Sequence, residues 1–562
     1  MKKILSFALS FAMILSLFSF AAFAEESTTE VNSGSNESTI SKIFSSGLYV
    51  KADPNAGLDG DVDVTLSILD GAYNLYLPGS ADASKLYLSW DSSKITLSID
   101  GIDYESGMAP IPAAGESITY TVKKNYLSLP MKICTVKGSE SVEAMYITVD
   151  ESRGTISDMN SDSEHETSCY GSLKLGGGKT KYMSIKGRGN STWIMDKKPY
   201  NITIYKDEEC TNKKKAEFIE GVESKKWSLL ANYFDNSLLR NKVAMDLAEN
   251  LGIGLETKFV DLWMNGEYLG NYLLTPKKDY NCSDDGFIIE NDHIDDDDNP
   301  DQFDFPDIAE MPLKHNRINV DDIGDNAADT GCDNAYIESW FTEAWDTVLD
   351  YDSEEYQKYF DLESWAKMYL MFEVSKTYDC YAGNIIMHRD GLEDTDLLYA
   401  GPAWDYDIAF GRTLHKFFVG VDELMQVNAE GWYNDSIGEC YTWIDEPVSI
   451  LQGLDRHISF RQKVAEVYKE YQWAFETVDS DIATQAELIR DSANMNNAKY
   501  TANSLCADYV ITPEIMSLLG TGEYALNYKV TTAWDDYVYN FREYCNKRIK
   551  WMTDNIDTIV SL

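Results

Sequence analysis

Two aspartates in the segment YDCYAGNIIMHRD, residues 378–390, have surroundings that suit the base of a phosphoryl transfer reaction. In such sites an aspartate takes the proton of the attacking hydroxyl, and an asparagine five residues later holds a metal ion. The tripeptide HRD ends at Asp390, but the fifth residue after Asp390 is Thr395, a poor metal ligand. The fifth residue after Asp379 is Asn384. Only the rest of the chain can decide between the two aspartates.

A second acidic pair lies shortly afterwards, in the segment PAWDYDIAFG at residues 402–411. Asp405 and Asp407 are two positions apart, so on an extended backbone their side chains point to the same side and could face one divalent ion. Either aspartate alone is equally consistent with a residue that caps a turn. Together with the preceding pair, they supply the oxygen ligands that magnesium prefers.

A glycine-containing turn precedes both segments. The stretch KGRGNSTW, residues 186–193, follows the strand-like KYMSI and precedes KKPYNITI, a second strand-like run. A turn of small residues lets backbone N–H groups approach a phosphate, and Lys197 or Lys198 on the next strand could reach its oxygens. Alone, the pattern is more typical of a β-turn with surface lysines. In the order turn, lysine strand, aspartate with asparagine, paired aspartates, it has the parts that Mg-ATP chemistry requires.

Local patterns indicate the elements that must position these residues. DLWMNGEYLGNYLL has two alternating apolar runs around Asn265-Gly266, which predicts a hairpin with a type I′ turn. NSLLRNKVAMDLAENLG has leucine and valine at four-residue spacing and ends at Gly252, which predicts a helix with a glycine cap. Further helices are expected over residues 364–379 and 533–559, and short strands at NIIMH and LLYAG.

The N-terminal part is of a different character. Residues 1–24 combine two lysines, a long apolar run and Ala-Phe-Ala, which predicts a cleaved signal peptide and secretion to the cell surface or beyond. Residues 25–44 have the composition of a disordered linker. Short alternating runs such as KLYLSW and SITYTV predict a β-sandwich over residues 45–141, in which we find no cluster of catalytic residue types. The remainder, 142–562, is mixed and carries the motifs above.

Charge and cysteine content restrict the partners. The formal net charge is −46, from 48 basic and 94 acidic residues. Such a chain repels nucleic acid and favours cations and basic protein partners. We see no apolar stretch after the leader that is long enough to span a bilayer. Nine cysteines without a C-x-x-C pair exclude a zinc ribbon and leave the disulfide pairing open.

The motifs as a set make the chain similar to the CotH family of secreted or spore-coat-associated atypical protein kinases. The similarity runs through most of residues 142–415 and lies in IKGRGNSTW with KKPY, KKWSLLANYFDNSLLRNKVAMDLAENLGI, DLWMNGEYLGNYLL, YDCYAGNIIMHRD and AGPAWDYDIAFG. The resemblance implies an α+β fold with a kinase-like, two-lobed catalytic domain. It also implies ATP with Mg²⁺ or Mn²⁺ as cofactors, and transfer of phosphate to Ser or Thr of a protein substrate, for which the acidic surface favours a basic one.

Roles carry over by position. Lys198 or its neighbour Lys197 resembles the lysine that binds the ATP phosphates, Asp379 the catalytic aspartate and Asn384 the metal ligand of the catalytic loop. Asp405 resembles the aspartate of a DFG-like element, which Asp407 supports. The resemblance also assigns the nucleotide to the turn residues Gly187, Arg188, Gly189 and Asn190. Asp390 then lies at the end of the NIIMH strand, and its likeness to HRD is accidental.

One position departs from the family pattern. After the hairpin the family usually has glutamate and lysine, as in LLTEK, whereas this chain has LLTPKK with Pro276 at the place of the glutamate. If that glutamate orients the lysine or the nucleotide, Glu290 must compensate or activity is impaired. The alternative to an active kinase is therefore an inactive, extracellular binding or scaffold protein. A metal-dependent hydrolase is the weaker third reading, because histidine is sparse and no H-E-x-x-H occurs.

Overall fold

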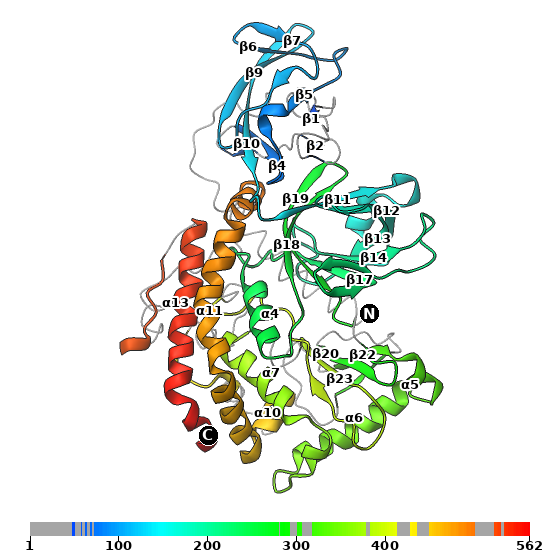
Figure 1. Cartoon of the computed structure of the whole chain (residues 1–562), viewed down its shortest axis with the longest axis vertical. Helices are drawn as coiled ribbons and strands as arrows, with labels where there is room; N and C mark the ends of the chain where they lie inside the picture. The colour runs from blue at the N-terminus through cyan, green and yellow to red at the C-terminus, as the bar shows by residue number, and fades with distance from the viewer. Residues whose placement is uncertain are drawn as a thin grey trace, which may run out of the picture.

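The computed structural model describes most of the chain beyond the N-terminal leader and linker. The described residues are 48–50, 58, 62–63, 68–69, 72–279, 282–292, 301–305, 317–377, 383–412, 428–434, 449–500, 522–529 and 533–562. They form a mixture of helices and sheets, which confirms the mixed α+β class (Figure 1). No helix among them is long and apolar enough to cross a membrane.

Short strands at the N-terminal end build two sheets, at the top of Figure 1. Their inner residues, among them Leu75, Leu88 and Tyr120, share one buried core. The smaller sheet has the order β2 (Val62–Asp63), β1 (Tyr49–Val50), β5 (Tyr87–Ser89), β8 (Ala109–Pro110). The larger has the order β3 (Ile68–Leu69), β4 (Ala72–Leu77), β10 (Leu127–Lys137), β9 (Ser117–Lys124), β6 (Thr96–Ile99), β7 (Ile102–Tyr104).

A closed barrel of seven strands occupies the middle of the molecule. Every strand hydrogen-bonds two neighbours, so the barrel has no free edge, and alternate side chains fill its interior, including Met183, Ile202 and Trp227. The strands, in barrel order, are β11 (Glu143–Val149), β12 (Ser168–Leu175), β13 (Lys181–Gly187), β14 (Tyr200–Tyr205), β17 (Lys226–Leu230), β19 (Glu267–Pro276) and β18 (Lys258–Met264). A separate small hairpin, formed by β15 (Ala216–Ile219) and β16 (Val222–Ser224), comes between β14 and β17 in the sequence.

The predicted hairpin and helix are both present. β18 and β19 pair across Asn265 and Gly266, which have φ of +48° and +85° as a type I′ turn requires. Helix α4 spans Arg240–Asn250, and Gly252 follows with φ of +78°, so the glycine closes the helix in the left-handed conformation.

A five-stranded sheet and most of the helices form the lower part of Figure 1. The sheet has the order β21 (Gln302–Asp304), β22 (Arg317–Ile323), β20 (Phe287–Asp292), β23 (Ile385–Arg389), β24 (Tyr399–Ala400). The predicted strands NIIMH and LLYAG correspond to β23 and β24. The main helices here are α6 (Asn334–Leu349), α7 (Leu362–Ser375), α11 (Ile458–Lys499) and α13 (Trp534–Asn555).

The helices pack around one apolar core. The helices expected near residues 364–379 and 533–559 are α7 and α13, and Phe541, Cys545 and Met552 of α13 are fully buried, as their periodicity predicts. The sequence analysis missed α6 and the 42-residue α11. α11 runs beside α13 and reaches up to the N-terminal sheets (Figure 1). The six described cysteines, Cys134, Cys169, Cys210, Cys282, Cys332 and Cys545, are all free thiols.

Candidate functional site

The paired aspartates and the glycine turn come together in the fold. Asp407 is buried and Asp405 is half-buried, and both negative charges act on the guanidinium of Arg188. Burial lowers the pKa of Arg188, and the two carboxylates oppose that shift, so Arg188 stays a cation. The guanidinium lies 5.6 Å above the ring of Trp404. Segments more than 200 residues apart in sequence thus form one charged site.

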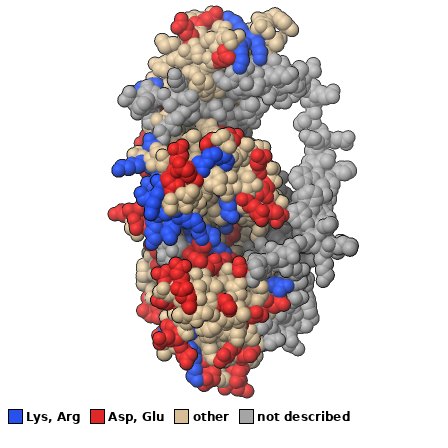
Figure 2. Space-filling view, turned by 90° about the vertical axis from the view of Figure 1, so that its right-hand side faces the viewer, with Lys and Arg blue, Asp and Glu red and all other residues tan. Residues whose placement is uncertain are grey.

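A pocket of about 320 Å³ opens beside Arg188. This volume is within the range of small-ligand pockets. Its walls combine the turn, the end of the β18–β19 hairpin and an indole ring, and include Lys186, Gly187, Arg188, Gly189, Lys277, Lys278 and Trp404. The lining thus carries four cations and one carboxylate, that of Glu164, which favours an anionic ligand such as a phosphate chain. Lys and Arg side chains gather around mid-height of the face that Figure 2 shows. The indole offers an apolar face for a flat group.

Packing explains the two glycines of the turn. A Cβ atom at Gly187 would lie 2.5 Å from the Trp193 ring, and Gly189 has φ of +79°. Any side chain at Gly187 would force the tryptophan away, and a larger residue at Gly189 would be strained. The neighbouring Asn190 is exposed and is not among the residues that line the pocket.

The two candidate lysines are not part of this pocket. Lys197 is almost fully buried and donates from Nζ to the carbonyl of Asn271 at 2.5 Å, with its ammonium 4.8 Å from the Tyr272 ring. Burial lowers the pKa of Lys197 to about 7, against the charges of Asp261 and Asp235. Lys198 donates from Nζ to the carbonyl of Trp193 at 2.5 Å. Neither lysine lines the pocket of about 320 Å³.

Lys278 is the lysine that reasoning from sequence missed. It lines the pocket, and its Nζ contacts the buried carboxylate of Glu290 and lies 3.2 Å from Asp321. Glu290, which was expected to compensate for Pro276, therefore pairs with Lys278 and not with Lys197 or Lys198. The doubled lysine after Pro276 was the available signal: Pro276 ends β19, and the next two residues turn into the pocket wall.

The register of β23 and β24 brings Asn384 to the same end of the sheet as Asp405. β23 and β24 are antiparallel with Met387 opposite Ala400, and the Gly401 N–H donates to the Ile386 carbonyl at 2.8 Å. The chain before β23, with Asn384, and the chain after β24, with Asp405, therefore leave this ladder at the same end. Glu290 lies opposite Ile386 on the neighbouring strand β20. Asn384 and Asp405 both have left-handed φ, +60° and +63°, the kind of backbone strain that clusters at functional sites.

The structure describes one of the two aspartates of the opening motif, Asp390. Asp379 lies outside the described residues, and α7 ends just before it at Ser375. Asp390 follows β23 directly, as expected, with its side chain 63% exposed. Arg389 of the HRD tripeptide is buried over the Trp340 ring and donates to the carbonyls of Glu393 and Asp396. In this chain the arginine of HRD is a structural residue.

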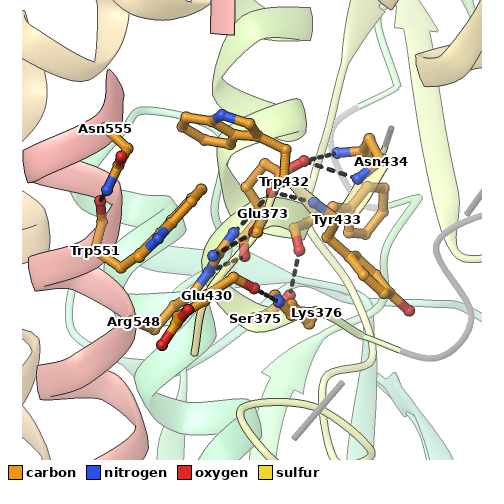
Figure 3. A network of polar contacts seen from close by, with 12 residues as sticks. Glu373, Ser375, Lys376, Glu430, Trp432, Tyr433, Asn434, Arg548, Trp551 and Asn555 are labelled. Atoms are coloured by element: carbon orange, nitrogen blue, oxygen red, sulfur yellow. Dashed lines mark hydrogen bonds and ion pairs between the residues drawn. The ribbon is translucent and has the colours of Figure 1, made fainter. Parts of the chain in front are cut away.

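A buried ion pair anchors the end of α7, where the opening motif begins (Figure 3). Arg548 of α13 donates to the Glu373 carboxylate at 2.8 Å and to the Glu373 carbonyl at 2.9 Å. The same carboxylate accepts from the backbone N–H groups of Tyr433 and Asn434, each at 2.8 Å. Lys376 takes the left-handed cap position with φ of +45°. The last turn of α7 is therefore fixed by α13 and by residues 428–434.

The donor set suits a hard divalent cation. Asp405, Asp407 and Asn384 offer carboxylate and amide oxygens, which magnesium and manganese prefer. Among the described residues no group of three or more His, Cys, Asp or Glu could hold a metal ion. Magnesium tolerates so few protein ligands, because it keeps several waters and binds the phosphates of its substrate. The residues present therefore fit a metal that is held jointly with a phosphate chain.

Comparison with known proteins identifies the family of the chain. No curated protein matches the chain closely enough to count as a relative. The family model described as CotH kinase protein matches residues 185–552, which include the glycine turn, the barrel hairpin, both acidic segments and most of α13. The chain belongs to the CotH kinase protein family.

Proposed function

We propose that this protein is a secreted atypical protein kinase that transfers the γ-phosphate of ATP to Ser or Thr of proteins outside the cell or on its surface. The observation that carries the proposal is the pocket of about 320 Å³, in which Arg188, Lys277 and Lys278 lie beside Trp404 and the Asp405 segment. The leader at residues 1–24 supports secretion.

Each part of the site has a task in this reaction. Arg188, Lys277 and Lys278 would bind and orient the phosphate chain of ATP, since each presents a cation at the pocket wall. Asn384, Asp405 and Asp407 would hold Mg²⁺ or Mn²⁺, which when bound neutralises charge that develops on the phosphates. Lys278 is kept in place by Glu290. By the family resemblance, Asp379 takes the proton of the attacking hydroxyl.

Binding of metal and nucleotide provides the test. In a thermal shift assay ATP should raise the melting temperature only when Mg²⁺ or Mn²⁺ is present, because the two bind together. Asp405→Ala should abolish this shift. Asp390→Ala, which removes an exposed carboxylate outside the pocket, should keep it. Equal stabilisation of the wild type by ATP without metal would contradict the assignment of the metal ligands.

One observation favours a second candidate, in which this chain has no catalytic activity. Pro276 replaces the glutamate that the family usually has, so a binding or scaffold role without catalysis is the second candidate. Incubation with labelled ATP, Mn²⁺ and a basic protein separates the two. Phosphate transfer that Asp379→Asn abolishes supports the kinase, and binding of Mn-ATP without any transfer supports the scaffold.

A further inference from the structure

The segment just before α4 is an unusually polar piece of the protein interior. Asn232, Asp235, Ser237, Arg240 and Asn241 are each at most 3% exposed. Burial of so many polar groups is costly unless each is bonded, and such networks fix a specific arrangement of the chain. The functional roles assigned so far make no use of this segment, although its sequence is one of the motifs that mark the family.

Asn241 joins the segment to the paired aspartates. Its Oδ1 accepts a hydrogen bond from the backbone N–H of Tyr406 at 2.6 Å, and Tyr406 is the residue between Asp405 and Asp407. Its Nδ2 donates to Oδ1 of Asn232 at 2.9 Å, and Asn232 donates to the Leu238 carbonyl. Since a backbone N–H can only donate, the amide of Asn241 has a single orientation that satisfies both bonds.

Arg240 makes a second connection to the same segment, at Ala409, three residues after Tyr406. Its Nε donates to the Ala409 carbonyl at 3.0 Å, while Nη1 bonds the Asp235 carboxylate at 2.5 Å. Asp235 in turn accepts from Ser237 and from the Arg240 backbone N–H. The cation is therefore neutralised within its own segment, and its Nε–H donates to the chain after Asp407.

The chain on either side of these two contacts is strained. Asp405 and Phe410 have φ of +63° and +53°, which L-residues rarely adopt, so the surroundings must hold the backbone there. Three contacts do so: Asn241 at the Tyr406 N–H, Arg240 at the Ala409 carbonyl, and the Ser375 carbonyl at the Phe410 N–H, at 2.6 Å. The left-handed turn at Asp405 thus depends on hydrogen bonds from elsewhere in the chain.

We propose that Asn241 is a positioning residue for the metal site: its side-chain amide holds the peptide N–H between Asp405 and Asp407, and so fixes both carboxylates for a divalent ion. Arg240 supports the far end of the same turn. This inference rests on the proposed function, in which these aspartates bind Mg²⁺ or Mn²⁺. Residues behind the ligands of a metal typically change its affinity about 10- to 100-fold when they are replaced.

The test measures backbone protection and metal affinity separately. In the metal-free protein, Asn241→Leu should accelerate hydrogen–deuterium exchange in the peptide that contains Tyr406. With a non-hydrolysable ATP analogue present, the same variant should weaken Mn²⁺ binding about tenfold. Asn241→Asp keeps the acceptor for Tyr406 and should retain more Mn²⁺ affinity than Asn241→Leu. Thr135→Val, which removes a buried side-chain bond to a carbonyl in the N-terminal sheets, is the matched control and should leave both readouts unchanged.

A second variant keeps the proposal testable if Asn241→Leu does not fold. Asn232→Gly removes the amide that orients Asn241, and glycine accepts the φ of +48° at this position without strain. It should likewise speed exchange at Tyr406 and weaken Mn²⁺ binding. Unchanged Mn²⁺ affinity in folded Asn241→Leu or Asn232→Gly would overturn the positioning role. Wild-type protein that binds neither Mn²⁺ nor the analogue would instead overturn the proposed function.

Discussion

Breaking the buried ion pair of Glu373 and Arg548 should lower the free energy of unfolding by several kilocalories per mole, and Arg548→Met tests this value. Both side chains are fully buried. The substitution keeps much of the apolar volume but removes the cation. It also removes the hydrogen bonds that Arg548 donates to the carbonyls of Ala429, at 3.0 Å, and Gly431, at 2.7 Å. The carboxylate keeps its bonds from residues 433 and 434 but loses its counter-charge. Breaking a buried pair in this way costs about 3–5 kcal/mol, a large share of the stability of a typical domain.

Urea denaturation of a double-mutant cycle measures this cost. Glu373→Gln and the double variant complete the cycle, and we expect the double variant to lose about 2 kcal/mol less than the sum of the single variants, because it contains no unpaired buried charge. The control is Arg542→Met on the same helix, whose partner Asp479 is 32% exposed. That pair should contribute at most about 1 kcal/mol. Equal losses for Arg548→Met and Arg542→Met would refute the argument from burial.

Two further predictions concern charged residues in or next to the barrel. Lys278→Ala should weaken binding of an ATP analogue at least tenfold, since a hydrogen bond to a charged group contributes about 1.5–3 kcal/mol. Lys198→Ala should have little effect on this binding. Isothermal titration calorimetry compares the two variants, and a larger loss of affinity in Lys198→Ala would contradict the pocket assignment. Burial raises the pKa of Asp261 to about 7, above the unfolded value of about 3.9. The folded chain therefore holds one more proton between these values, and the stability that this proton provides is present below about pH 4 and lost as the pH rises to 7. Asp261→Asn should flatten the dependence of the urea midpoint on pH in this window, and an unaltered slope would show that Asp261 does not titrate there.

The parts of the fold that could be predicted from sequence are those with local signals. Asn265-Gly266 forms its turn because few other pairs accept two positive φ values, and α4 ends at Gly252 for the same reason. The missed helix α11 also carried a signal, since Val464, Val467 and Phe475 follow a helical spacing on its buried side. A closed barrel could not be predicted, because closure depends on the pairing of β11 with β18, about 115 residues away.

The site was only partly predictable for a similar reason. Motif spacing predicted Asn384, Asp405 and Arg188 as site residues, because each lies in a compact sequence pattern. It could not distinguish the lysines. Lys197 is buried between β19 and the end of α11, where it donates to the Asn271 carbonyl and lies near Tyr500. Lys278 lines the pocket and forms an ion pair with Glu290 on another sheet. Which lysine faces the ligand depends on contacts between segments that sequence spacing does not show.

The contact between α11 and the N-terminal sheets affects how the molecule can be divided. Ser139 accepts from the N–H groups of Asp491 and Ser492, and its own N–H donates to the Ser492 hydroxyl. Trp263 and Tyr268 at the tip of the barrel hairpin belong to the same apolar core as the N-terminal strands. A fragment that begins at residue 142 would expose both rings to water and leave the end of α11 without its clamp. The N-terminal sheets therefore cover the outer side of the β18–β19 hairpin and share one apolar core with it, so the two parts form a single folding unit.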